Sequence, residues 1–219
     1  MRRTLEWVLG LTSFAAGAMD VISFARLGGV LTSAMTGNIA LLGLYIGRNE
    51  AAAALGSVVA LIAFIIGTAA AAWAVRPHAQ SRALQRLLAA ELVLLLAGAA
   101  LWLATGQPHK GFYCDGVIAL FAIAMGVQII VGRQLNLSGI PTVVFTSTLT
   151  NIVIGMTEVF ARKTWKMPPD AMRQCVALVL YFAGALAAGI CVYTGTPFII
   201  ALPIAAVGAA LAALARPAV

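Results

Sequence analysis

Long, uninterrupted apolar runs constrain this chain more than any other feature. Six segments of about twenty apolar residues each are separated by short polar turns: 5–24, 51–75, 83–104, 113–132, 172–193 and 197–215. A helix needs roughly 20 apolar residues to cross the hydrocarbon core of a bilayer. The runs are continuous and do not alternate as the strands of a membrane barrel do. They therefore predict an all-α protein that crosses a membrane several times and contacts the lipid bilayer.

The composition supports this class and excludes others. The chain has 219 residues, of which 62% are hydrophobic and 10% charged, and its mean hydropathy is +1.00. A soluble fold of this size has too little interior for so much apolar surface. The net charge of +7 comes from Lys and Arg between the apolar runs, which is typical of cytoplasmic loops and not of a nucleic-acid surface. The first run holds Asp20 and has no clear cleavage site, so we interpret it as a mature helix.

Two further apolar segments, 31–47 and 142–160, begin with polar and small residues. Gly28 and Gly29 precede the first, and Pro141 precedes the second, so we expect helices to begin near Thr32 and Thr142. Helices of this length are shorter than the roughly 30 Å hydrocarbon core. The pattern favours two re-entrant or broken helices that start inside the membrane.

The chain also repeats itself. The stretch MTGNIALLG (35–43) is similar to FTSTLTNIVIG (145–155), and FIIGTAAAA (64–72) is similar to YFAGALAAG (181–189). Because the similar stretches occur in the same order, they indicate one membrane domain, 1–219, built from two repeats, 1–107 and 108–219.

The basic residues favour one of two membrane layouts. If the two polar-headed segments return to the side from which they enter, only Arg26, Arg48 and Lys110 lie outside. The chain then has six spans and two inverted repeats, with both termini cytoplasmic. The alternative is eight spans in two parallel repeats, which divides the basic residues more evenly between the two sides.

The two polar-headed segments carry the candidate solute-binding residues. Two helix starts that enter from opposite faces would present free N–H groups near the midplane, which suits an anion or a polar solute rich in acceptors. Small and hydroxyl residues also pack membrane helices against one another. Both interpretations of these segments, a solute site and a helix-packing surface, therefore stay open. The candidates are Thr32, Ser33, Thr36, Gly37 and Asn38 in the first segment and Thr142, Thr146, Ser147, Thr148 and Asn151 in the second.

Three polar residues inside the long runs form a second group. Asp20 and Glu91 are acids within apolar segments, and charged groups in a membrane are usually functional. Asp20 lies 12 residues before Thr32, so the chain can fold back to bring the two together; a desolvated Asp20 would suit proton coupling. Gln128 occupies nearly the matching place in the second half. Pairing with nearby arginines is the structural alternative for both acids.

Enzyme signatures are absent from the sequence. The two histidines, His78 and His109, lie far apart, and the three cysteines have no metal-ligand spacing. We therefore expect no enzymatic activity, no metal and no cofactor.

The stretches GAMDVISFARLGGVLTSAMTGN (17–38) and GVQIIVGRQLNLSGIPTVVFTSTLTN (126–151) resemble the YoaK-like family of bacterial membrane proteins, a domain of unknown function. The resemblance covers almost the whole chain. It implies a protein of the bacterial inner membrane and names no substrate. In this family the first helix of the second half often reads Gln-Asn, where this chain has Gln128 and Ile129.

These observations lead to two hypotheses. The first is a small secondary transporter or channel for a small polar or anionic solute, with its site at the facing helix starts. The second is a non-transporting membrane subunit in which the same residues pack against a partner protein. Small-residue helix faces, such as Gly67 with Ala71, also allow self-association of the chain.

Overall fold

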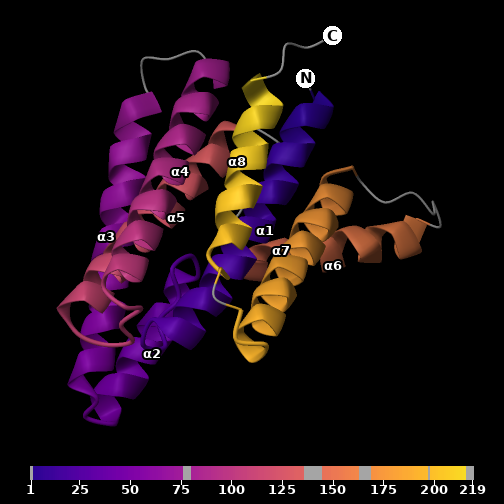
Figure 1. Cartoon of the computed structure of the whole chain (residues 1–219). Helices are drawn as coiled ribbons and strands as arrows, with labels where there is room; N and C mark the ends of the chain where they lie inside the picture. Colours follow the sequence, from indigo (N-terminus) through magenta and orange to yellow (C-terminus); the bar gives the residue numbers. More distant parts are fainter. Residues whose placement is uncertain (1, 76–79, 136–144, 163–168, 197, 216–219) are drawn as a thin grey trace.

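The computed structural model describes residues 2–75, 80–135, 145–162, 169–196 and 198–215. The described residues form eight α-helices and no strands (Figure 1). The helices are α1 (Arg2–Arg26), α2 (Met35–Gly47), α3 (Ala51–Val75), α4 (Gln80–Ala104), α5 (Phe112–Gln134), α6 (Phe145–Arg162), α7 (Pro169–Tyr193) and α8 (Ala201–Ala215). The all-helical prediction is confirmed.

Five helices, α1, α3, α4, α5 and α7, are long and apolar enough to cross a membrane. The sixth expected span, 197–215, is shorter in the structure, because residues 198–200 form a turn and α8 begins only at Ala201. Its 15 residues cover about 22 Å at 1.5 Å per residue. The polar-headed segments give α2 and α6. Helix α2 begins at Met35, a few residues after the expected start, whereas α6 is described from Phe145 and the expected start at Thr142 lies outside the described residues.

Helices α1 and α5 form the centre of the bundle, and most of each is buried. Helix α1 packs against α7 and α8, whereas α5 packs against α3 and α4. Helix α2 contacts α3, and α6 contacts α7. Helices α3 and α7 expose large apolar side chains on their outer surfaces, including Ile65, Ile66, Phe182 and Leu186. These surfaces suit contact with lipid.

Pairs of glycines set the two closest helix crossings. A Cβ on Gly17 of α1 would collide with the backbone carbonyl of Tyr181 in α7, and one on Gly184 would collide with that of Phe14. The α3–α5 crossing is built in the same way by Gly67 and Gly126. Backbones this close leave no room for a side chain, as is common where membrane helices associate.

The directions of the helices determine which helix starts and helix ends meet at each end of the bundle. Helices α1, α4 and α7 run one way, and α3, α5 and α8 run the other (Figure 1). At the end where α1 finishes, the imidazole Nδ1 of His109 lies 2.9 Å from the carbonyl oxygen of Arg26. At the other end, Glu6 near the start of α1 contacts Arg173 near the start of α7.

Candidate functional site

The chain reverses direction between α1 and α2. Gly28 and Gly29 have φ values of +77° and +79°, a left-handed conformation that glycine adopts at little cost. The Tyr45 hydroxyl, near the end of α2, donates a 2.8 Å hydrogen bond to the Gly29 carbonyl oxygen. The start and the end of the segment 29–45 are therefore joined, and α2 returns to the end of the bundle that α1 had reached.

Asp20 fixes the backbone of this connection within the bundle. Its Oδ1 accepts hydrogen bonds from the backbone N–H groups of Thr32 (3.0 Å) and Ser33 (2.7 Å). Its Oδ2 accepts from the Ser33 hydroxyl (2.6 Å) and from the Tyr181 hydroxyl of α7 (2.8 Å). Both carboxyl oxygens therefore act as hydrogen-bond acceptors, with two donors each. The fold-back of Thr32 onto Asp20, expected from the sequence, is present.

The depth of this network follows from its place on α1. Asp20 lies six residues, or about 9 Å, before the end of α1 at Arg26. Asp20, Thr32 and Ser33 are all buried, with at most 3% of each residue exposed. The connection that precedes α2 is therefore buried beside α1 and α7 at Thr32 and Ser33, whereas α2 itself begins at Met35, nearer the surface, and packs against α3.

Asn38 holds the other side of the connection. Its side-chain Oδ1 accepts a 2.8 Å hydrogen bond from the Leu31 N–H, and its Nδ2 donates to the Leu31 carbonyl oxygen. The Ser23 and Thr32 hydroxyls lie 3.2 Å apart. The polar residues of this stretch therefore satisfy backbone groups that would otherwise be unpaired in an apolar interior.

Thr36 and Gly37 lie apart from this network. The sequence placed the helix start near Thr32, but Thr32 precedes the helix and is buried, whereas Thr36 is in its first turn and exposed. The reason is that α2 starts at Met35. A Cβ on Gly37 would come 2.6 Å from the Leu31 side chain, so Gly37 allows the connection to pack against the helix start.

The second polar cluster is described in part. Thr142 lies outside the described residues, as do the side chains of Thr146 and Ser147. In α6, Thr148 is buried and Asn151 is exposed. Within the described part of the chain, α6 packs on α7 and does not touch α2, so these residues do not bring the two clusters together.

Glu91 and Gln128 lie elsewhere in the interior, and both are fully buried. Gln128 of α5 donates from Nε2 to the Thr12 carbonyl oxygen of α1, at 2.9 Å. The Gln128 Oε1 and both Glu91 carboxyl oxygens have no hydrogen-bond partner among the described residues. The structural alternative for Glu91, pairing with the nearby Arg86, is not present, since Arg86 is exposed and the ion pairs of the described residues all involve Arg173.

A cavity of about 660 Å³ opens at the end where α1 finishes. It lies between the α1–α2 connection and the starts of α3 and α5, and its polar lining carries both signs of charge. The residues that line it include Leu27, Gly28, Glu50, His109, Lys110 and Asp115. Leu27 and Gly28 belong to the α1–α2 connection, but Asp20 and the residues that bind it do not line this cavity.

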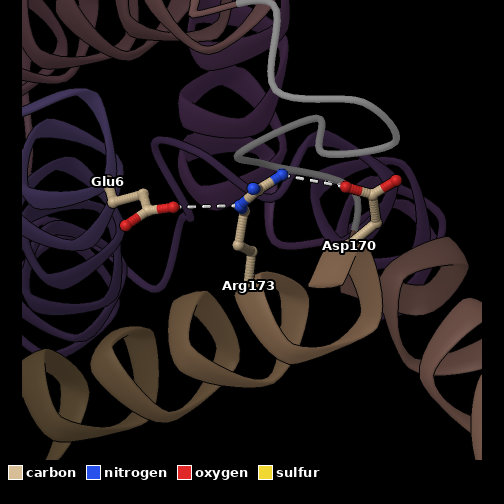
Figure 2. Close-up of polar contacts among 3 residues, drawn as sticks. All are labelled: Glu6, Asp170 and Arg173. Atoms are coloured by element: carbon tan, nitrogen blue, oxygen red, sulfur yellow. Dashed lines mark hydrogen bonds and ion pairs between the residues drawn. The ribbon is translucent and has the colours of Figure 1, made fainter. Parts of the chain in front are cut away.

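An ion-pair group closes the opposite end of the α1–α7 contact (Figure 2). Arg173 Nε lies 3.2 Å from a Glu6 carboxylate oxygen, and Arg173 Nη1 lies 2.9 Å from an Asp170 oxygen. Both acids are largely exposed, so this group adds at most about 1 kcal/mol of stability. It joins α1 and α7 near their starts.

Sequence reasoning missed Tyr181, the residue that joins Asp20 to the second half of the chain. Its signal was present, because Tyr181 stands where the similar stretch of the first half has Phe64. The hydroxyl is the added group, and it is the group that contacts Asp20. As for metals, the described residues contain no group of three His, Cys, Asp or Glu side chains that could hold one.

The fold and this buried polar network define a polytopic α-helical membrane protein with a helix connection folded into its interior. The family model described as a protein of unknown function, DUF1275, matches residues 8–215. The chain is also 32% identical over 203 residues to the UPF0700 transmembrane protein YoaK of Bacillus subtilis (strain 168), covering 90% of this chain and 88% of that protein. No solved structure matches. The chain belongs to the DUF1275 family, and the predicted YoaK-like resemblance is confirmed.

Proposed function

We propose that this protein is a small secondary transporter or channel for a small polar solute, without enzymatic activity, in the bacterial inner membrane. The observation that carries the proposal is the non-helical connection before α2, whose residues Thr32 and Ser33 are buried in the bundle and held by Asp20. Interrupted helices inside a membrane protein are tolerated where they line a cavity or a binding site. In many secondary transporters such interruptions form the substrate site.

The arrangement of the helices supports two inverted repeats, 1–107 and 108–219. Exchanging α1, α2, α3 and α4 with α5, α6, α7 and α8 converts each major helix contact into another that is present. The α1–α7 contact becomes α5–α3, and α1–α8 becomes α5–α4. Three of the four corresponding pairs, α1 and α5, α3 and α7, and α4 and α8, run in opposite directions (Figure 1), as inverted repeats require, whereas α6 lies across the bundle.

The distribution of basic residues supports an orientation with cytoplasmic termini. Arg3, Arg82 and Arg173 lie at the end where α1 starts, whereas Arg26, Arg48 and Lys110 lie at the opposite end. More of the chain's Lys and Arg residues belong to segments at the first end, which the positive-inside rule assigns to the cytoplasm. The cavity beside Glu50 and His109 then opens to the outside.

The contacts of Asp20 also narrow the proposed solute class. The N–H groups of Thr32 and Ser33 would attract an anion, but the Asp20 carboxylate already accepts from both. We therefore favour an uncharged polar solute over an anion. It would enter through the outer cavity and compete for the hydroxyl groups of Ser33 and Tyr181, which the carboxylate holds in the present conformation.

Uptake into liposomes tests this proposal directly. Purified protein is reconstituted, and entry of radiolabelled glycerol, urea, sugars, amino acids and acetate is compared with protein-free liposomes. We expect at least one uncharged or zwitterionic solute to enter faster, and Ser33→Ala to slow its entry several-fold by removing one donor to Asp20. Thr36→Ala is the matched control, because it removes an exposed hydroxyl from the same region. If no solute of the panel enters faster, the transport proposal fails.

A further inference from the structure

Glu91 is an acid in the middle of α4, a helix long and apolar enough to cross a membrane. It is fully buried, and neither carboxyl oxygen has a hydrogen-bond partner among the described residues. It shares the buried face of α4 with leucines, namely Leu84, Leu88 and Leu95. An ionised carboxylate left unpaired in such surroundings is too costly to persist, so something must neutralise it.

The packing of α4 against α5 determines which residue of α5 lies at the level of Glu91. The two helices run antiparallel, and a Cβ on Gly98 would collide with the ring of Phe121. Seven residues are nearly two full helical turns, so a step of seven returns to the same face of a helix. Seven residues before Gly98 is Glu91, and seven after Phe121 is Gln128. The two side chains therefore lie at the same level on the facing sides of the α4–α5 contact.

The Gln128 amide presents an acceptor at this contact. Its NH₂ group donates to the Thr12 carbonyl oxygen, which accepts hydrogen bonds only, so the orientation of the amide is determined. Its Oε1 is buried and has no partner among the described residues. Glu91 and Gln128 thus present oxygen acceptors to each other and no hydrogen-bond donor. A proton on one of the Glu91 oxygens supplies that donor.

No other titratable group among the described residues competes for this place. Helices α3 and α8, which also pack on α4, contain no titratable side chain. On α5, Tyr113, Cys114 and Asp115 lie about 20 Å along the helix from Gln128, and Arg133 is exposed. On α4, Arg82 and Arg86 are exposed and form no ion pair with Glu91.

We propose that Glu91 holds a proton inside the membrane and donates it in a hydrogen bond to Gln128 Oε1. The bond gives both unpartnered groups a partner and leaves the interior without net charge. Through Gln128, the proton site of α4 is connected to the Thr12 backbone of α1. The assignment concerns a proton in the resting protein and does not depend on the proposed transport activity.

Infrared spectroscopy of the purified, reconstituted full chain tests this assignment. At neutral pH, the difference spectrum between the wild type and Glu91→Gln should show the C=O stretch of one protonated carboxyl group. The band should shift in D₂O, and Asp20→Asn should retain it. In Gln128→Leu we expect the band at higher frequency, because its hydrogen-bond acceptor is gone; a proton held without Gln128 would give no such shift.

Two results would overturn the assignment. The first is a carboxylate stretch in place of the protonated band in the wild-type minus Glu91→Gln spectrum. The second is conversion of the band to a carboxylate stretch when sodium chloride replaces choline chloride, which would make the group a sodium site. Glu91→Leu, which replaces the carboxyl group by an apolar side chain like those of its neighbours on α4, provides the same comparison if Glu91→Gln does not fold.

Discussion

At the scale of single residues, two buried acids in this protein have opposite surroundings. Asp20 accepts four hydrogen bonds, from two backbone N–H groups and two hydroxyls. Glu91 has no partner among the described residues. The sequence suggested Asp20 for proton coupling; its contacts show that it holds the α1–α2 connection, and our proposal places a resting proton on Glu91.

Asn38→Ala tests whether the polar residues of the α1–α2 connection stabilise it. The substitution leaves the N–H and the carbonyl of Leu31 without their partner, which should lower the free energy of unfolding by about 2 kcal/mol or more. Thr36→Ala, on the exposed side of the same helix start, should change it by less than about 0.5 kcal/mol. Denaturant unfolding in detergent micelles measures both. Equal losses would mean that the Asn38 bonds do not stabilise the connection.

At the scale of the helices, the apolar runs predicted six spans, and five of them are helices long and apolar enough to cross a membrane, with about the expected limits. They did not predict that α8 has only 15 residues, because the turn before it depends on how the chain leaves α7. The sequence indicated that Thr32 can reach Asp20, since only the last residues of α1 and the Gly28–Gly29 connection lie between them. It could not indicate the contact of Asp20 with Tyr181, because that contact joins helices distant in sequence through their packing.

The α1–α7 and α3–α5 crossings should tolerate no side chain at their glycines. In Gly17→Ala the new methyl group would collide with the Tyr181 carbonyl, and in Gly126→Ala with that of Phe64. Because backbone atoms cannot turn aside, we expect each variant to lose about 1–3 kcal/mol of stability. Gly189→Ala, a helical glycine of α7 with nothing within 4 Å, should be neutral or up to about 1 kcal/mol more stable. Thermal unfolding in detergent compares the three, and equal stability would contradict the close crossings.

At the scale of the whole molecule, the proposed inverted repeats depend on how many times the chain crosses the membrane. The sequence left two layouts open, and loop charges alone favoured the one with re-entrant segments. The structure adds that the segment 29–45 is joined at its two ends by the Tyr45–Gly29 hydrogen bond and that Gly28 and Glu50 line one cavity. Both contacts favour a segment that returns to its own side, and with it the proposed inverted repeats.

The most direct test is the sidedness of single cysteines at three exposed positions: Arg3, Arg48 and Arg82. Each is introduced into a variant without the three native cysteines and labelled with an impermeant maleimide in intact and in permeabilised cells. The account predicts that Arg48→Cys is labelled in intact cells, whereas Arg3→Cys and Arg82→Cys are labelled only after permeabilisation. Labelling of Arg82→Cys in intact cells, with Arg48→Cys and Arg3→Cys protected, would establish eight spans and contradict the inverted-repeat account.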